Sequence, residues 1–477
     1  MSGHTLDSSF KDRVDDALEQ DFLLGAVRFT TNRLRDGRDR AVAQEPEFEA
    51  WRDSLSAARR RALSNLDSVI ETFATRAQAH GTHVHFAADA AEACEIVVEI
   101  ARASSVKLAA KGKSMLSEEI GLNDALEAAC IEALETDLGE WIIQLAGERP
   151  SHIILPVIHK SRGDIRELFE AHKGGQLTDD TATLAGYARE QLRTEFLRAD
   201  MGITGCNIAI AEAGAVALFS NEGNGRMVST LPRVHVALMG VERIIENVAD
   251  FADLVRLLPR SATGQDITTY VNVLQGPARS DEHDGPRELH VVVVDAGRTA
   301  QLASPDFHDA LACIRCGACL NVCPVYSHVG GHAYGTVYPG PIGAVLEPLF
   351  SGDDEQRAEL ANASTLCGAC YEVCPVRIPL HDMLVSLRAR NVDEGYVGGR
   401  ELAQQKLASF VMASPSRYSV ATRIVRAIAR PLNGEGAIAR FGREHAPGVA
   451  RQLRHRAWPQ IPRKSFRQLW RSSRAED

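Results

Sequence analysis

The sequence predicts an α/β domain with a mainly parallel sheet, followed by an all-α domain and a basic helical C-terminal arm. Apolar strand-like runs alternate with helical segments from about residue 80 to 300, and they stop after Asp295. Beyond that point, seven of the ten cysteines of the chain gather between residues 313 and 374. We expect four parts: an N-terminal helical segment (1–70), the α/β domain (71–300), the cysteine-rich domain (301–395) and the arm (396–477).

The composition bounds the class of protein. The 477 residues are enough for two to four domains, and 45% are apolar and 24% charged, as in globular proteins. No run approaches the roughly 18 apolar residues of a membrane-spanning helix, and the polar N-terminus lacks the apolar core of a signal peptide. We therefore expect a cytoplasmic protein with reduced thiols, in which clustered cysteines bind metal rather than form disulfides.

The elements follow from local periodicity. Apolar residues from Phe48 to Phe73 recur at three- and four-residue steps, which predicts helix in the N-terminal segment. In the α/β domain, helices are expected at Ala90–Ala103, Ser117–Ala133 and Gly163–His172. Strands are expected at Thr82–Ala87, Val106–Ala110, His152–Ile158, Ile208–Glu212, Ala215–Ser220, Val234–Met239, Thr268–Leu274 and His290–Asp295.

The C-terminal arm is basic, although the whole chain has a net charge of −10. Residues 400–477 hold 16 Lys and Arg against 5 Asp and Glu. Such an arm favours docking to the acidic body, to a partner protein or to an anionic surface; a solvated helical tail is the alternative. Ile424–Arg430 predicts amphipathic helix, and the last 30 residues predict an extended arm. Few aromatic residues lie between the arginines to stack on bases, so we expect no nucleic-acid binding. Contact with a membrane, if the arm makes one, is expected to be peripheral and at its inner face.

The cysteines form two related motifs. The first is Cys313-x2-Cys316-x2-Cys319-x3-Cys323-Pro324, and the second is Cys367-x2-Cys370-x3-Cys374-Pro375. Cysteines at every third residue hold one face of an iron–sulfur cluster, and the cysteine before proline usually binds the neighbouring cluster. Zinc is the alternative, although zinc sites usually show two spaced pairs. The crossed pattern predicts cluster 1 at Cys313, Cys316, Cys319 and Cys374, and cluster 2 at Cys323, Cys367 and Cys370.

Cluster 2 lacks a fourth thiolate. When the motifs are aligned on their Cys-Pro ends, Ser364 stands opposite Cys313. Ser364, His332, His381, water or a residue from another chain could complete the site. We expect two [4Fe-4S] clusters, with a [3Fe-4S] cluster as the alternative at the second site.

Six stretches of the chain resemble the lactate utilization protein B family, and the resemblance covers nearly the whole length. In that family the first cysteine of the second motif is also replaced. The stretches are Cys313–Pro324, Gly331–Leu346, Leu366–Pro379, Lys111–Asn123, Glu135–Ala146 and Gly202–Arg226.

The resemblance implies both fold and function. The α/β domain would be a lactate-utilization domain, similar to the sugar-phosphate isomerase and CoA-transferase folds. The cysteine-rich domain would be a two-cluster α-helical ferredoxin. The chain would be the iron–sulfur electron-transfer subunit of a complex that oxidises L-lactate to pyruvate. Its partners would be a cysteine-rich-repeat protein and a second lactate-utilization-domain protein.

The α/β domain offers a candidate ligand cleft. Lys111, Lys113 and Ser114 follow a strand and open a helix, which is an anion-binding arrangement. Further candidates are Glu222 and Arg226 in a Gly-rich loop, and Glu212 at the end of another strand. Ordinary turns and solvated caps give the same pattern. We identify no catalytic residue and expect the chemistry elsewhere in the complex.

The loop between the motifs carries His332, Tyr334 and Tyr338, which could donate hydrogen bonds to cluster sulfides or simply pack the loop. Two other functions fit the motifs less well. One is a ferredoxin-type subunit of an oxidoreductase for glycolate, glycerol phosphate or a heterodisulfide. The other is a redox-sensing protein that binds nucleic acid through the arm.

Overall fold

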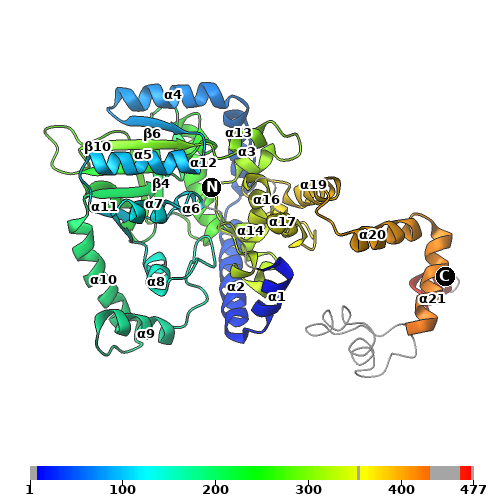
Figure 1. Ribbon diagram of the computed structural model, residues 1–477. Coiled ribbons are helices and arrows are strands. Elements are labelled where there is room, and N and C mark those ends of the chain that lie inside the picture. Colours follow the sequence, from blue (N-terminus) through cyan, green and yellow to red (C-terminus); the bar gives the residue numbers. More distant parts are fainter. Residues whose placement is uncertain (1–7, 352–354, 430–461, 463, 474–477) are drawn as a thin grey trace. The chain divides into compact units, whose positions relative to one another are not determined.

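The computed structural model describes residues 8–351, 355–429, 462 and 464–473. Its contacts divide the chain into two units, Met1–Arg390 and Asn391–Asp477. The first unit contains the N-terminal helices, the α/β domain and the cysteine-rich domain (Figure 1).

Four helices open the first unit, as expected from the N-terminal periodicity. The helical pattern from Phe48 to Phe73 forms two helices rather than one, because the chain bends at Asn65, whose φ and ψ are −121° and 31°. The bend lets the two halves bury their apolar faces in different cores: Leu55 packs with the cysteine-rich domain, and Phe73 packs on the main sheet. The helices are α1 (Phe10–Leu18), α2 (Asp21–Ala43), α3 (Phe48–Ser64) and α4 (Leu66–Ala79).

The main sheet of the α/β domain has six strands, and every pair is parallel. Successive residues of its strands point to opposite cores: Val292 packs with helix α5 (Ala90–Ala103), and Val293 packs with α4. The prediction of an α/β domain with a mainly parallel sheet is confirmed. In spatial order the strands are β1 (His83–Ala87), β10 (Glu288–Val294), β7 (Val234–Gly240), β4 (Met201–Gly205), β2 (Leu108–Lys111) and β3 (Glu132–Glu135).

A second, mixed sheet of four strands joins the α/β domain to the cysteine-rich domain. Ile208 and Ile210 face the core of the cysteine-rich domain, whereas Ala209 faces the core under α4. The strand pattern predicted most of these strands but not their separation into a second sheet. In spatial order they are β8 (Ile244–Ile245), β5 (Ile208–Ile210), β6 (Ala215–Ser220) and β9 (Tyr270–Leu274).

Two expected elements of the α/β domain are wrong. The segment His152–Ile158 is not a strand, because it curls on itself: the His152 ring accepts hydrogen bonds from the N–H groups of Ile154 and Leu155, at 3.0 and 3.2 Å. The expected helix Ser117–Ala133 breaks at Gly121, which has a φ of +69°, and its end forms strand β3. The remaining helices of the domain are α6 (Met115–Glu119), α7 (Leu122–Ala128), α8 (Leu138–Ala146), α9 (Arg162–Lys173), α10 (Thr181–Arg198), α11 (Asn224–Thr230), α12 (Val248–Ala262) and α13 (Arg298–Leu302).

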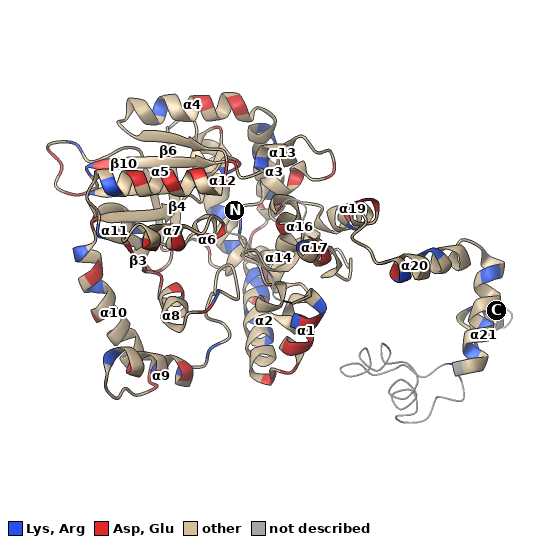
Figure 2. Ribbon diagram, viewed as in Figure 1, with Lys and Arg blue, Asp and Glu red and all other residues tan. Residues whose placement is uncertain are grey.

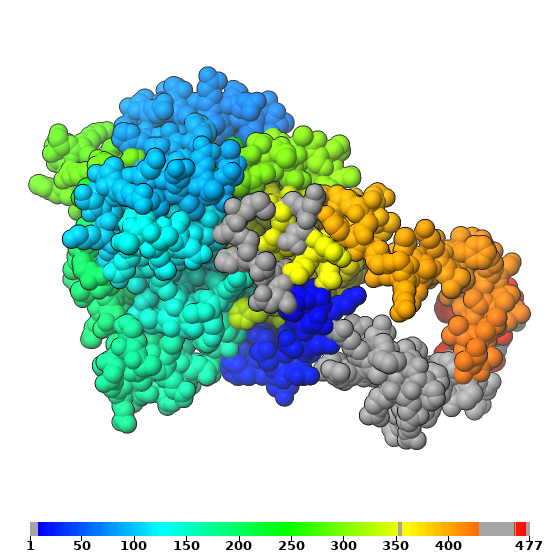
Figure 3. Space-filling model, viewed as in Figure 1, coloured from blue at the N-terminus to red at the C-terminus, as the bar shows by residue number. Residues whose placement is uncertain are grey.

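The cysteine-rich domain is built from short helices, and its described residues contain no strand. It shares one core with α2 and α3, and the N-terminal helices and this domain meet on the surface shown in Figure 3. Its elements are η1 (His308–Ala312), α14 (Ala318–Asn321), α15 (Tyr326–Val329), η2 (His332–Tyr334), α16 (Gly340–Phe350), α17 (Glu355–Ala358), η3 (Glu359–Asn362), α18 (Ala369–Val373) and α19 (Leu380–Asp393).

The second unit contains α20 (Gly399–Met412), α21 (Pro415–Ala429) and α24 (Phe466–Ser473). The amphipathic helix expected at Ile424–Arg430 is part of α21, except for Arg430, which lies outside the described residues; α21 carries three arginines and no acidic residue (Figure 2). Most of the expected extended end also lies outside the described residues. The expectation is wrong for Phe466–Ser473, where Ser465 caps a helix by accepting the Gln468 N–H. No helix in the described part of the chain is long and apolar enough to cross a membrane.

Candidate iron–sulfur centre

The structure brings four cysteines from both motifs around one pocket. Cys313, Cys316 and Cys319 come from the first motif, and Cys374 comes from the Cys-Pro end of the second. The rest of the lining is largely apolar and includes Ile342, Val376, Ile378 and Leu380. This set is the one that the crossed pattern assigns to cluster 1.

The other three cysteines form a second group. Burial, and then the neighbouring Cys323 and Cys367, raise the pKa of the Cys370 thiol to about 12. The pKa of Cys323 is raised first by burial and then by Cys367. Cys323 and Cys370 are buried, but Cys367 is exposed. The second group therefore reaches the protein surface at Cys367.

Each cysteine motif begins with a sharp turn. Arg315 and Gly317 in the first motif have φ values of +57° and +73°, and Leu366 and Gly368 in the second have +54° and +81°. The left-handed conformation is costly for residues other than glycine, so its repetition shows a turn that the surrounding structure holds in place. The turn points backbone N–H groups inward, and one of them, that of Arg315, donates to Cys313 Sγ at 3.4 Å.

Two more backbone N–H groups contact sulfur atoms. Tyr326 N–H donates to Cys323 Sγ, and Ile378 N–H donates to Cys374 Sγ, both at 3.4 Å. Hydrogen bonds of this kind stabilise the negative charge of a ligating thiolate and help to set the reduction potential of a cluster.

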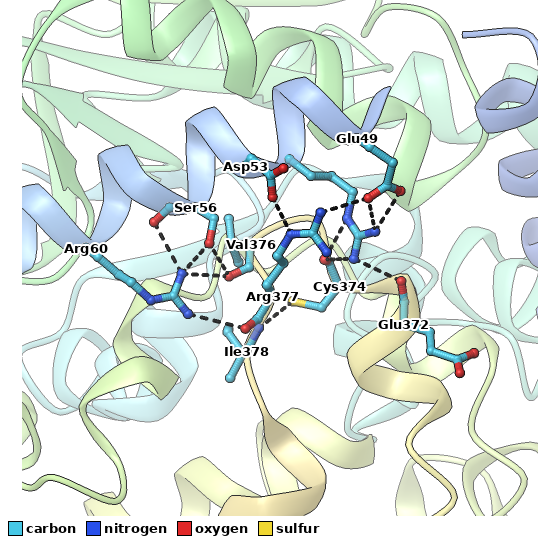
Figure 4. A network of polar contacts seen from close by, with 10 residues as sticks. Glu49, Asp53, Ser56, Arg60, Glu372, Cys374, Val376, Arg377 and Ile378 are labelled. Atoms are coloured by element: carbon cyan, nitrogen blue, oxygen red, sulfur yellow. Dashed lines mark hydrogen bonds and ion pairs between the residues drawn. The ribbon is translucent and has the colours of Figure 1, made fainter. Parts of the chain in front are cut away.

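Helix α3 holds the loop that carries Cys374 (Figure 4). The buried Arg52 donates to the carbonyl oxygen of Cys374 through Nη2 at 2.8 Å and to that of Glu372 at 2.9 Å. About two turns further along the same helix, Arg60 donates to the carbonyl oxygens of Val376 and Arg377, both at 3.2 Å. The position of the last cysteine thus depends on residues more than 300 positions earlier in the chain.

A buried ionic network joins the first cysteine turn to the α/β domain. The carboxylate of Glu242 lies 2.9 Å from Arg298 Nε and 3.6 Å from Arg315 Nη2. Burial alone would raise the pKa of Glu242, but Arg298, Arg315 and Arg243 outweigh that effect and hold the pKa below its usual value. Arg243 also donates to the carbonyl oxygen of Cys313 at 2.6 Å, and Arg59 donates to that of Ala312 at 3.3 Å. Positive charge is therefore concentrated beside the first motif.

The first group suits a cubane cluster chemically. Burial raises the pKa of Cys316, Cys319 and Cys374, so their thiolates need a positive partner in that pocket. Iron is such a partner, and the pocket supplies four soft sulfur donors with an apolar surround. Among the described residues, no three Cys, His, Asp or Glu side chains lie close enough for a single metal ion. A cubane does not require that spacing, because each of its four thiolates binds a different iron.

The three polar residues of the loop between the motifs have different surroundings. Tyr338 donates to Glu119 Oε2 at 2.6 Å, and the His332 ring bonds to the carbonyl oxygen of Arg149 at 2.8 Å. Tyr334 is fully buried, and its hydroxyl has no hydrogen-bond partner among the described residues. Its pKa is raised first by burial and then by Cys323. Of the three, Tyr334 is the residue whose buried hydroxyl can still donate a hydrogen bond near the cysteines.

The expected cleft of the α/β domain is occupied by ion pairs. Lys111 Nζ lies 2.6 Å from Glu135 Oε1, and Lys113 Nζ lies 3.3 Å from Glu140 Oε1. Burial raises the pKa of Glu140 to about 7, and burial with nearby carboxylates raises the pKa of Glu118 well above its usual value. The ring of His152 lies 3.3 Å from Asn321 in α14, within the first cysteine motif. Burial, and then Lys113, lower the pKa of His152 to about 4.

The other expected cleft residues are less closely joined. Ser114 caps α6 by accepting the Ser117 N–H at 3.2 Å. Glu222 is exposed and accepts the Leu138 N–H at 3.3 Å. Its pKa is raised first by desolvation and then by Asp137, and Lys113 opposes that shift. Glu212 is exposed and accepts the Val248 N–H at the start of α12, and Arg226 is exposed on α11. The structure therefore brings Lys111, Lys113 and Ser114 together, with Glu222 beside them.

Comparisons with known proteins decide the family. The chain matches the family models of the LUD domain over residues 70–294 and of a 4Fe-4S dicluster domain over residues 309–378. Lactate utilization protein B of Oceanobacillus iheyensis is 42% identical over 98% of this chain and 97% of its own. The chain belongs to the lactate utilization protein B family. The expected resemblance is thereby confirmed, as is the order of an α/β domain before a cluster-binding domain.

Other members of the family are similarly close. The protein of Bacillus licheniformis is 42% identical over 98% of this chain and 97% of its own, and that of an Exiguobacterium species is 47% identical over 82% and 83%. A solved structure of a DUF162 family protein from Deinococcus radiodurans has a TM-score of 0.27 at 16% identity, and covers 48% of this chain and 98% of its own.

The sequence did not indicate several buried acids and arginines of the candidate site. Glu118 and Glu140 lie inside the segments that carried the resemblance, so a search there for buried acids beside the lysines would have found them. Arg59, Arg243 and Glu242 had no such signal. Their partners are distant in sequence, and an arginine on a helix usually lies in solvent.

Proposed function

We propose that the chain is the iron–sulfur electron-transfer subunit of a complex that oxidises L-lactate to pyruvate. The observation that carries the proposal is the crossing of the two motifs, in which Cys374 joins three cysteines of the first motif around one pocket. Membership of the lactate utilization protein B family supports lactate as the substrate of that complex. When bound, iron–sulfur clusters would accept and pass on electrons one at a time.

The proposed ligands follow the two groups. Cluster 1 would be a [4Fe-4S] cluster held by Cys313, Cys316, Cys319 and Cys374. Cluster 2 would be held by Cys323, Cys367, Cys370 and a fourth ligand that is not cysteine. Because Cys367 is exposed, whereas the four cysteines of the first group are buried or half-buried, we propose that redox partners approach the second site. The protein's own contribution is to bury the thiolates, supply N–H donors and place arginines beside the first motif.

We propose that this subunit does not itself activate lactate. Oxidation of lactate removes two protons together with two electrons. It requires a base that takes up a proton and a cation that binds the lactate carboxylate. The candidate cations Lys111 and Lys113 are already paired with Glu135 and Glu140. This pairing favours a structural role for the polar cluster and places the chemistry in two partner subunits, a cysteine-rich-repeat protein and a second lactate-utilization-domain protein.

The arm would contact those partners or the inner face of the membrane. Within α21, the apolar Ile424, Val425 and Ile428 are more than half exposed, and Arg423 and Arg426 lie among them. A helix with exposed apolar residues and several arginines suits an anionic protein or lipid surface. We expect cytoplasmic protein, where the ligating thiols stay reduced, and no nucleic-acid binding.

The test begins with the full chain purified anaerobically. Iron and sulfide are counted, and EPR spectra are recorded before and after dithionite. We expect about eight irons and two interacting reduced clusters. Cys316→Ser should remove the cluster 1 signal, whereas Cys130→Ser, at an exposed cysteine outside both motifs, should not. Stoichiometric zinc without iron would refute the proposal.

The reaction is tested with the three subunits expressed together. L-lactate should reduce a dye only when all three are present, and Cys316→Ser should abolish that activity. Glycolate and glycerol phosphate serve as competing substrates. Turnover of either one in preference to L-lactate would favour the alternative oxidoreductases.

A further inference from the structure

The second cysteine turn has the same backbone conformation as the first, but it begins with a serine instead of a cysteine. The residues two and four positions after Cys313 have left-handed φ values, and so do the residues two and four positions after Ser364. Ser364 therefore occupies the position in the second turn that Cys313 occupies in the first.

The side chain of Ser364 makes the same contact as that of Cys313. In the first turn, Arg315 N–H donates to Cys313 Sγ at 3.4 Å. In the second, Leu366 N–H donates to Ser364 Oγ at 3.0 Å. The N–H group two positions later therefore contacts the first side chain of both turns, the sulfur in one and the hydroxyl oxygen in the other.

A guanidinium group also holds each turn at the same atom. Arg243 donates to the carbonyl oxygen of Cys313 at 2.6 Å, and Arg388 donates to the carbonyl oxygen of Ser364 at 3.0 Å. A second bond from Arg388, to Ala361 O at 2.9 Å, anchors the approach to the turn. The positive charge beside Ser364 favours an anionic oxygen over a neutral hydroxyl.

The two histidines are weaker candidates. The Nε2 atom of His332 is already bonded to the Arg149 carbonyl oxygen, and its ring packs edge-on to His159 at 4.4 Å. His381 lies beside Tyr371 at a ring distance of 5.5 Å, and its Nδ1 has no hydrogen-bond partner among the described residues. His381 is therefore the rival that an experiment must exclude.

We propose that Ser364 Oγ is the fourth ligand of the cluster held by Cys323, Cys367 and Cys370. The inference rests on the proposed function, because it requires that cluster. Ligation forms one Fe–O bond and breaks the Ser364 O–H bond, and the proton goes to water without any electron transfer. Oxygen is a harder ligand than sulfur and favours oxidised iron, so this cluster has a lower reduction potential than one with four thiolates.

The experiment compares full-length variants that are purified and reconstituted anaerobically. Ser364→Ala should lose about one iron per chain and show the EPR signal of an oxidised three-iron cluster. Ser364→Cys should keep the iron count and raise the reduction potential of one cluster. Thr365→Ala, which removes the neighbouring exposed hydroxyl, and His381→Ala should match the parent protein.

The outcomes separate the inference from the function on which it rests. A parent protein without iron contradicts the proposed function. A parent protein with eight irons, and Ser364→Ala with an unchanged spectrum, contradicts only the Ser364 ligand. Loss of one iron in His381→Ala, but not in Ser364→Ala, would assign the ligand to the histidine instead. If Ser364→Ala fails to fold, an unchanged potential in Ser364→Cys overturns the inference by itself.

Discussion

Replacing Arg52 by methionine should release cluster 1 selectively. The Arg52 side chain is 6% exposed and donates to the carbonyl oxygens of Cys374 and Glu372. Methionine has a similar length but no donor, so both carbonyls lose a charged partner. Leaving a buried polar group unsatisfied costs about 1–3 kcal/mol, which gives roughly 2–6 kcal/mol for the pair. That cost acts on the segment that carries Cys374, whose thiolate we assign to cluster 1.

Arg377→Met is the matched control in the same loop. Its side chain lies 2.8 Å from Glu49 and 2.7 Å from Asp53, but these carboxylates are 61% and 67% exposed. Such surface pairs contribute about 0–1 kcal/mol. Iron release into a chelator would be followed by absorbance, with EPR to identify the cluster that remains. We expect release from Arg52→Met to be at least tenfold faster than from Arg377→Met. Equal rates, or earlier loss of cluster 2, would refute the reasoning.

Three further predictions follow from buried polar groups. Tyr334→Phe removes the free hydroxyl near Cys323 and should lower the potential of one cluster in an EPR-monitored titration, without changing the iron count. Arg298→Met leaves two carboxylates without their buried partner and should reduce the free energy of unfolding in urea by about 3–5 kcal/mol, whereas the exposed Arg256→Met should change it little. Because burial raises the pKa of Glu140 to about 7, the folded state keeps a proton that the unfolded state releases near pH 4.5. Stability should therefore fall as the pH rises from about 4.5 to about 7, and Glu140→Gln should flatten that part of the urea-unfolding profile.

The sequence predicted those parts of the molecule whose signal is local. Alternating strands and helices were enough for the parallel sheet, and cysteine spacing indicated the four cysteines that line one pocket. His152–Ile158 shows the limit of such signals: the apolar run correctly indicated burial, but Ile153 is buried against the cysteine-rich domain rather than in a sheet. An apolar run alone does not say which partner covers it.

Within the candidate site, the sequence predicted the cysteines but not the residues that surround them. Arg59 belongs to an ordinary helical pattern, yet its side chain is fully buried. It donates to the carbonyl oxygens of Glu242 and Leu311. Those partners are fixed by tertiary packing, so no spacing within helix α3 could indicate them. The same is true of the pairing of Lys113 with Glu140, which requires two segments of the domain to meet.

The crossing of the two motifs has a consequence for how the protein is made. In the proposed ligand sets, neither cluster can be filled from one motif alone, because Cys374 would bind cluster 1 and Cys323 would bind cluster 2. During synthesis the ribosome must reach residue 374 before the first group is complete, although the α3 arginines that receive it were made long before. Cluster insertion would therefore be a late step, and each cluster would cross-link the two motifs between residues 313 and 374. Loss of either cluster would loosen the loop that carries a ligand of the other. Oxidation of the cluster at the exposed Cys367 would therefore also destabilise cluster 1.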